Sequence, residues 1–311
     1  MRVIKGWKDL MARDRGAAVA LGNFDGVHRG HQKVIALAAQ AARANGAPLG
    51  VISFDPHPRQ IFAPDAPAFR LMRPGQQARA LDGLGVDLFY VLPFDQEMAG
   101  LTDHDFAQKV LHEGLGVSHV AVGFDISFGK GRTGSPATMK DYGQALGFGV
   151  SVAAAVADDS GEKYSSTAVR DALREGHPEA AAAILGRPFA IEGVVQRGRQ
   201  LGRQLGFPTA NVQVDDYVQP RFGVYATRTR LPDGRQVPGV ANIGVNPTVG
   251  EVAPVLEVWL FDFNEDLYDQ TIETDLITFL RPEQKFSGLE AMVEQIGRDA
   301  SEARKILMPD F

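Results

Sequence analysis

Two histidines stand three positions apart in a glycine-rich segment near the start of the chain, which reads GNFDGVHRGH. The side chains of these residues, His28 and His31, can donate hydrogen bonds to phosphate, as can the free backbone N–H groups at a helix N-terminus. Gly22, Gly26 and Gly30 would let the backbone turn and approach a ligand closely. These residue types at this spacing indicate a phosphate site suited to nucleotidyl transfer, which needs positioned donors and no covalent nucleophile.

Other interpretations of this segment stay open at this point. His28 and His31 are also consistent with a loop residue and a helix cap that have no catalytic task. A zinc site lacks a third ligand at a diagnostic spacing, because Asp25 alone is a weak indication. The basic, glycine-rich stretch GKGRTG at residues 129–134 does not have the residue order of a phosphate-binding P-loop.

A second donor-rich segment, GRQLGRQLGFPTAN, occupies residues 198–211. Glycines and arginines in a flexible loop can wrap a polyphosphate. The side-chain oxygens of Thr209 and Asn211 suit a magnesium ion, which takes few protein ligands beside phosphate and water. We therefore expect a loop here that binds a nucleotide and a metal ion.

Glu257 is a candidate general base. It stands between Val255 and Trp259 in an alternating apolar segment, and residues two apart in a strand share a face. A carboxylate beside an apolar surface tends to have a raised pKa, which suits it to accept a proton near neutral pH. A solvated glutamate on an edge strand is the alternative.

The elements that would position the first segment alternate between strands and helices. Ala17–Phe24 is a near-continuous apolar run, typical of a buried parallel strand, and His31–Ala44 carries apolar residues at helical spacing. Further strands are expected at 49–54, 87–92 and 118–123, and further helices at 102–115, from 135 onward, at 168–175 and at 179–185. Thr102 and Ser135 are placed to cap two of these helices. The alternation predicts an α/β domain with a parallel sheet.

The pattern changes after residue 185. Alternating apolar segments separated by turn-forming residues then follow, at 189–196, 223–230, 237–243, 255–261 and 271–280. They predict an all-β barrel or sandwich. Ser287–Glu290 has the spacing of a capping box, and the apolar stripe behind it predicts a closing helix that ends near Leu307. The expected domains are residues 1–185 and 186–311.

Composition narrows the class of protein. The formal net charge is −6 at pH 7, which argues against a nucleic-acid partner, because the phosphate backbone rewards a concentrated basic face. The chain has no cysteine, so disulfides, thiolate nucleophiles and cysteine-ligated zinc are excluded. The first ten residues lack the apolar core of a secretory signal, and no apolar run approaches the roughly 20 residues that cross a bilayer. We expect a cytoplasmic protein without a membrane partner; an oligomer is possible.

Several segments together resemble the bacterial bifunctional riboflavin kinase/FAD synthetases. GNFDGVHRGH is similar to the signature of the H-x-G-H nucleotidyltransferase superfamily, and FDPHP (54–58), VGFDISFG (122–129) and YSSTAVR (164–170) follow in the order of that family. GFPTAN (206–211) is similar to a flavokinase signature, and LEVWLFDFNEDLYD resembles the glutamate-bearing strand of the same enzymes. The resemblance implies a Rossmann-like nucleotidyltransferase domain followed by a six-stranded barrel.

For the first domain, the resemblance implies an ATP site and a flavin site. His28 and His31 would act on the ATP phosphates. The other residues implied at the ATP site are Gly22, Asn23, Phe24, Gly30, Asp125, Lys163, Ser166, Thr167 and Arg170. The flavin would lie against His57, Phe62 and Phe128. Lys163 stands near a position where the family usually has arginine, and it keeps the charge without the bidentate fork.

For the second domain, the resemblance implies transfer of the ATP γ-phosphate to the 5′-hydroxyl of riboflavin. Glu257 would take the hydroxyl proton, and Thr209 and Asn211 would hold Mg²⁺ and phosphate. The residues implied at the kinase ATP site are Gly202, Gly206, Pro208, Thr209 and Asn211. The expected function is phosphorylation of riboflavin to FMN and adenylylation of FMN to FAD, with riboflavin, FMN and ATP as the small-molecule substrates.

Two other functions stay open. One is an enzyme with the same N-terminal chemistry and another acceptor, such as pantetheine phosphate or nicotinate mononucleotide. The other is a nucleic-acid-binding barrel joined to a degenerate transferase. The GFPTAN segment weighs against the first, and the acidic balance weighs against the second.

Overall fold

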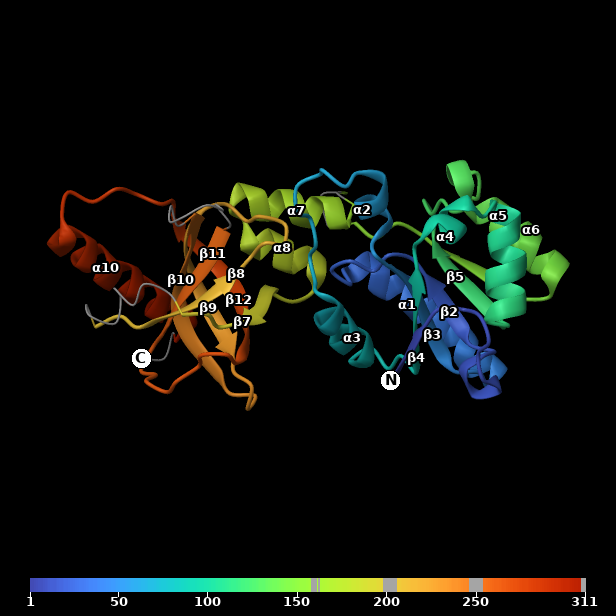
Figure 1. Ribbon diagram of the computed structural model, residues 1–311, viewed down its shortest axis with the longest axis horizontal. Coiled ribbons are helices and arrows are strands. Elements are labelled where there is room, and N and C mark those ends of the chain that lie inside the picture. The colour runs from blue at the N-terminus through green and yellow to red at the C-terminus, as the bar shows by residue number, and fades with distance from the viewer. Residues whose placement is uncertain (158–160, 162, 198–205, 246–253, 309–311) are drawn as a thin grey trace. The chain divides into compact units, whose positions relative to one another are not determined.

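The computed structural model describes residues 1–157, 161, 163–197, 206–245 and 254–308, which Figure 1 traces as a ribbon. The chain forms two units. The first comprises Met1–Ala66 and Pro74–Ser165, and the second comprises Pro67–Arg73 and Ser166–Phe311. The sequence pattern instead places the division after residue 185. The division of the two activities at residues 185/186 stays a prediction.

The first unit is built on a six-stranded parallel sheet with the strand order β1-β4-β3-β2-β5-β6. The strands are β1 (Arg2–Lys5), β2 (Ala18–Leu21), β3 (Leu49–Asp55), β4 (Leu88–Pro93), β5 (His119–Gly123) and β6 (Gly149–Ala153). All four residues of β2 are buried, as expected for a central strand covered on both faces. The predicted parallel α/β sheet is confirmed.

The strand order reverses at β2. The chain passes from β2 to β3 and β4 on one side, and it returns to β5 and β6 on the other. In open α/β sheets, ligands bind outside the carboxyl ends of the strands at such a reversal. The histidine-bearing segment directly follows β2, so the fold places it in that position.

The helices of the first unit follow the strands. They are α1 (Arg29–Asn45), α2 (Pro58–Phe62), α3 (Pro74–Asp82), α4 (Gln96–Gly100), α5 (Asp103–Asp105) and α6 (Pro136–Leu146), with 3₁₀ turns η1 (Ala12–Asp14) and η3 (Lys130–Arg132) and a π-helix η2 (Phe106–Gly114). The expected cap at Ser135 is confirmed, since its side chain accepts from the Thr138 N–H. The single α-helix expected at 102–115 is wrong: Thr102 caps α5, and the chain then widens into η2, where the Leu115 N–H reaches the Val110 carbonyl.

The second unit contains a six-stranded antiparallel sheet with the order β7-β12-β9-β10-β11-β8. The strands are β7 (Phe189–Val194), β8 (Thr209–Gln213), β9 (Gly223–Arg230), β10 (Gln236–Val245), β11 (Pro254–Leu260) and β12 (Thr271–Arg281). Its two outer strands meet where the Gln196 N–H, just after β7, donates to the Asn211 carbonyl at 2.8 Å. The sheet therefore closes on itself, and the expected six-stranded barrel is confirmed.

The described part of the second unit contains the helices α7 (Ser166–Glu175), α8 (Pro178–Leu185) and α10 (Leu289–Leu307). Figure 1 shows α10 alongside the barrel, and Ala300, Ala303 and Leu307 of α10 pack in one apolar cluster with strand residues. The expected capping box at Ser287 is wrong, because Gly288 is the N-cap and makes no side-chain hydrogen bond. None of the helices in the described part of the chain combines the length and the apolar character that crossing a bilayer requires.

Asp275 on β12 makes stability depend on pH. Burial raises its pKa to about 6, with a further increase from Glu273, against the opposing effect of Arg230, Arg187 and Arg228. The folded state therefore binds this proton more tightly than the unfolded state does, and the contribution to stability is full below about pH 4 and is lost as the pH rises through about 6. We expect denaturation midpoints of the protein to show this loss between pH 4 and 6, and Asp275→Asn to remove it. Parallel curves for the two proteins would contradict the assignment.

Candidate active sites

The backbone turns sharply between β2 and α1. Phe24 and Val27 have positive φ angles of 51° and 44°, and Gly26 between them has 87°. Such angles are uncommon for residues with side chains and persist where the surroundings fix them. Phe24 and Val27 are each only 1% exposed, so core packing holds the turn in place.

The turn brings His28 and His31 together at the start of α1. His28 is the N-cap, and its Nδ1 accepts from the His31 N–H at 3.3 Å. The two imidazole rings stack with centroids 3.6 Å apart, and the His31 ring also lies 5.1 Å from the ring of Phe24. A Cβ on Gly30 would lie 2.9 Å from His28 Cε1, so glycine is needed there for the ring to fit. The two candidate catalytic histidines therefore also form the N-terminal cap of α1: His28 is the capping residue, and His31 supplies the N–H that it binds.

Two residues that the sequence did not indicate hold Asn23. Its backbone carbonyl accepts from the Ser53 hydroxyl at 2.9 Å and from Gln77 Nε2 at 3.0 Å. Ser53 lies near the carboxyl end of β3, and Gln77 lies on α3. Because they fix the backbone, the exposed Asn23 side chain stays available at the predicted phosphate site.

Asp125 and Lys163 form an ion pair next to β5. Lys163 Nζ also lies 4.5 Å from the centroid of the Phe124 ring. The chain around Lys163 is fixed by an antiparallel bridge to Ala157. Two residues predicted at the ATP site are thus brought together, and the lysine that stands in for arginine has a carboxylate partner.

Ser166, Thr167 and Arg170 lie on α7 in the second unit. Ser166 and Thr167 are its first residues, so the helix begins two residues earlier than expected. Arg170 is 8% exposed, and its Nε donates to the Phe69 carbonyl at 2.7 Å. This buried contact gives Arg170 a structural role, and the predicted contact of all three residues with ATP stays a prediction.

Two of the three residues predicted at the flavin site, Phe62 and Phe128, lie at the ends of a row of aromatic rings. From Phe62 the row passes through Phe94, Phe54 and Phe106 to Phe128, with successive centroid distances of 5.7, 5.7, 6.3 and 5.8 Å. Phe62 is 71% exposed. An exposed ring that continues an aromatic row is a ready surface for a planar ligand.

His57, the third predicted flavin residue, caps α2. Its Nδ1 accepts from the Arg59 N–H at 3.1 Å, and its own N–H donates to Gln60 Oε1 at 3.1 Å. These two bonds fix the helix that carries Phe62. His57 therefore has a clear structural task, and its predicted contact with flavin stays a prediction.

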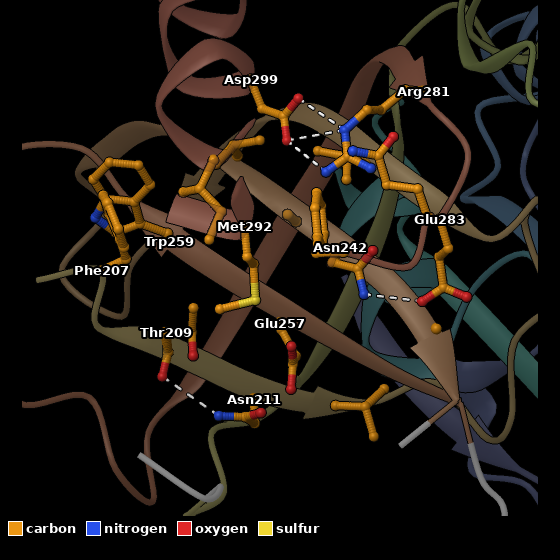
Figure 2. Close-up of a pocket in the computed structure, with 18 of the residues that line it drawn as sticks. Phe207, Thr209, Asn211, Asn242, Glu257, Trp259, Arg281, Glu283, Met292 and Asp299 are labelled. Atoms are coloured by element: carbon orange, nitrogen blue, oxygen red, sulfur yellow. Dashed lines mark hydrogen bonds and ion pairs between the residues drawn. The ribbon is translucent and has the colours of Figure 1, made fainter. Parts of the chain in front are cut away.

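In the second unit, a cavity of about 410 Å³ opens between the barrel and α10. Glu257, Thr209 and Asn211 all line it, and Figure 2 shows their oxygens facing the same space. The rest of the lining is mainly apolar, with Phe207 and Trp259 on one side and Met292 of α10 above. Apolar walls with a few convergent polar groups are typical of small-molecule sites.

Strand register places three polar side chains in a row. Asn211 on β8 is opposite Glu257 on β11, and Glu257 is opposite Asn242 on β10. Directly opposed residues in antiparallel strands point to the same face, with Cβ atoms about 4.5–5.5 Å apart. Glu257 thus lies on an inner strand with a carboxamide on each side, and the alternative of a solvated edge-strand glutamate is wrong. The sequence did not indicate a role for Asn242.

A second cavity of about 300 Å³ shares Thr209 and Asn211 with the first. Pro208 lines only this second cavity, whereas Glu257 lines only the first. The segment predicted as a flexible loop is therefore partly wrong: Thr209 and Asn211 lie on β8, where pairing with β11 overrides the turn-forming composition around them. Of the other predicted nucleotide ligands, Gly206 precedes the strand with a φ of 87°, and Gly202 lies outside the described residues.

Ion pairs fix the outer wall of the second cavity. Glu265, which lines it, accepts two hydrogen bonds from Arg235 at 2.7 and 2.8 Å, and these hold the pKa of Glu265 below its ordinary value. Asp262, at the start of the same loop, pairs in a similar way with Arg304 of α10. The loop that bounds this cavity is thus tied to a hairpin on one side and to α10 on the other.

A buried ion pair joins α10 to β12 beside the first cavity. Arg281 donates to both carboxylate oxygens of Asp299, with distances between 2.7 and 3.1 Å, and Gln295 donates to the same carboxylate at 2.8 Å. The Asp299 side chain is 5% exposed and that of Arg281 is 18% exposed. Because both residues line the cavity, this pair sets the position of the helical wall (Figure 2).

Replacing Asp299 with alanine is expected to lower the free energy of unfolding by about 3 kcal/mol, because it leaves a largely buried guanidinium without its carboxylate. The matched control is Asp262→Ala, which breaks the exposed pair with Arg304 and should destabilise the protein much less, because water screens exposed pairs. Urea denaturation followed by tryptophan fluorescence measures both. Equal losses in the two variants would show that the buried pair has no special weight.

Models of two protein families match this chain. The FAD synthetase family matches residues 10–168, and the riboflavin kinase family matches residues 185–307. The bifunctional riboflavin kinase/FMN adenylyltransferase of Pseudomonas fluorescens is 42% identical over 310 residues, which cover 99% of each chain. This chain belongs to the bifunctional riboflavin kinase/FMN adenylyltransferase family.

Other comparisons also match this chain over nearly its whole length. The enzyme of the same description from Escherichia coli K12 is 39% identical over 306 residues, covering 98% of this chain and 97% of that one. A crystal structure from Streptococcus pneumoniae, described as a macrolide-efflux protein, matches with a TM-score of 0.87 and 30% identity over 97% of this chain and 98% of that one. Family membership therefore extends over both units.

Proposed function

We propose that this chain phosphorylates riboflavin to FMN in its barrel and adenylylates FMN to FAD in its α/β unit, with ATP as co-substrate of both steps. The observation that carries the proposal is the pair of cavities that meet at Thr209 and Asn211, with Glu257 on one side only. A phosphoryl transfer needs a donor and an acceptor held on opposite sides of the transferred group. The family matches on both units support the second step in the same chain.

In the kinase step, riboflavin occupies the larger cavity and ATP the smaller one. Glu257 accepts the proton of the 5′-hydroxyl as the hydroxyl oxygen attacks the γ-phosphorus, and ADP leaves. Thr209 and Asn211 lie where the transferred group crosses between the cavities, so their donors and oxygens face the charge that develops there. The apolar lining beside Trp259 excludes water, which would otherwise compete as an acceptor.

The residues present fit a magnesium ion in this step. Hard oxygen ligands are supplied by the Thr209 hydroxyl and the Asn211 carboxamide, both of which line the two cavities. Asn211 Nδ2 donates to the Thr209 carbonyl at 3.4 Å, and Figure 2 shows the Asn211 oxygen directed away from that bond. A magnesium ion bound there would neutralise charge on the ATP phosphates.

In the adenylylation step, a phosphate oxygen of FMN attacks the α-phosphorus of ATP, and pyrophosphate leaves. His28 and His31, at the N-terminus of α1, would hold the phosphates by side-chain donors and by the free N–H groups of the first turn. The aromatic row that begins at Phe62 would receive the flavin ring. Asp125 and Lys163 would belong to the same ATP site, together with Ser166, Thr167 and Arg170 of α7. The two activities would divide near residues 185/186.

The test is an assay of the purified full chain with riboflavin, ATP and magnesium, with flavins separated by chromatography. Appearance of FMN and then FAD supports the proposal. Absence of both products, or conversion of pantetheine phosphate or nicotinate mononucleotide in place of FMN, rejects it.

A further inference from the structure

Glu283 places a second carboxylate at the rim of the larger cavity. It lies just after β12, and its Oε1 accepts from Asn242 Nδ2 at 3.3 Å. Figure 2 shows the Asn242 carboxamide between Glu283 and Glu257. Glu283 is exposed to solvent, so its carboxylate is accessible to a molecule that enters the cavity.

A glycine makes room for this carboxylate. A Cβ built on Gly244 would overlap the Glu283 carboxylate oxygen, and it would lie 2.8 Å from Glu283 Cδ and 3.2 Å from Asn242 Nδ2. Gly244 follows Asn242 by two residues, so both face the cavity from the same strand. The hydrogen bond from Asn242 and the space left by the glycine at position 244 together determine the position of the Glu283 carboxylate.

The position of Glu283 relative to Glu257 restricts what it can bind. Asn242 is directly opposite Glu257, with Cβ atoms about 4.5–5.5 Å apart, and Glu283 contacts the far side of the same carboxamide. If Glu257 contacts the reacting 5′-hydroxyl, Glu283 lies beside the neighbouring part of the acceptor. In riboflavin that part is the ribityl chain, whose hydroxyls are donors, whereas the ring N–H is at the opposite end of the molecule.

We propose that Glu283 binds the ribityl chain of riboflavin by accepting a hydrogen bond from one of its non-reacting hydroxyls. The inference rests on the proposed kinase function of this cavity and adds a specificity residue to it. A hydroxyl that enters the cavity loses hydrogen bonds to water, and a carboxylate acceptor replaces one of them. An aliphatic chain offers no donor, so the Glu283 carboxylate would lose its own hydrogen bonds to water without a replacement. Glu283 thereby selects for the polyol, while Glu257 acts on its terminal hydroxyl.

Two variants test this in different ways. Glu283→Ala removes the acceptor, and Gly244→Ala keeps the charge but displaces the carboxylate. The exposed Glu302 on α10 is a matched control for loss of charge, since it lines neither cavity. The measurements are riboflavin KM and kcat in FMN formation, and the equilibrium affinities of riboflavin and of lumichrome, an alloxazine similar in shape to the flavin ring that has no ribityl chain.

Both variants are expected to raise KM and Kd for riboflavin about three- to tenfold, the usual size of one lost hydrogen bond. We expect kcat to stay nearly constant, because such a contact is equal in the ground and transition states. Lumichrome affinity should not change, and Glu302→Gln should match the parent protein. An equal loss of lumichrome affinity, or an unchanged KM for riboflavin, would overturn the inference. A parent protein that neither binds nor phosphorylates riboflavin would instead reject the kinase function itself.

Discussion

Replacing Glu257 with glutamine is expected to lower kcat for FMN formation by about 10²–10⁴-fold, the usual contribution of a general base. Glutamine keeps the size of the side chain and its place between Asn211 and Asn242, and it removes the proton acceptor. The expected change is therefore in kcat, with little change in the KM for ATP or riboflavin. Initial rates of FMN formation at saturating substrates measure it.

The control is the other activity of the same molecule. FAD formation from supplied FMN should be unaffected in Glu257→Gln, because Glu257 lies on β11 of the barrel and every residue proposed at the adenylylation site lies outside the barrel strands. A variant that keeps near-parent FMN formation would remove Glu257 from its proposed role. Loss of both activities would point to a folding defect and not to a missing base.

His31→Ala is expected to lower FAD formation from FMN by about 10²–10³-fold, since one positioned donor to the reacting phosphates is lost. The His31 imidazole stacks on the His28 ring, whereas the backbone N–H of His31, which alanine retains, donates to His28 Nδ1. FMN formation should continue, so FMN should accumulate when the variant is given riboflavin and ATP. Chromatography of a single reaction mixture shows both effects.

His28 needs a different substitution because it caps α1. His28→Ala would remove the acceptor for the His31 N–H and cost about 1 kcal/mol of stability, whereas asparagine is a good N-cap. His28→Asn should therefore keep the parent denaturation midpoint while it lowers FAD formation. Normal FAD formation in both His28→Asn and His31→Ala would show that the two histidines only shape the turn.

Local patterns account for most of what the sequence predicts correctly. The burial of β2, the cap at Ser135 and the stripe of α10 depend on residues close together in the chain, so periodicity and capping chemistry indicate them. The H-x-G-H segment is similarly local: its two histidines are three positions apart, and one helical turn is enough to bring them together.

Long-range pairing accounts for what the sequence did not predict. β8 became a strand because β11 pairs with it, and Asn242 joined the site because register placed it opposite Glu257. Ser53 and Gln77 reach Asn23 from elements 30 and 54 residues away. No periodicity within any one of these segments carries such information, because it is created only when the sheets assemble.

The barrel seam has a consequence for how the kinase can fluctuate. The amide of Gln196 is held by the carbonyl of Asn211, the same residue whose side chain lines both cavities. A motion that separates the two outer strands breaks this hydrogen bond and removes one of the contacts that hold Asn211 at the proposed nucleotide site. The hydrogen-exchange rate of the Gln196 amide therefore reports how often the outer strands separate beside the proposed kinase site. Bound ATP should slow this exchange, because it would stabilise the closed strands.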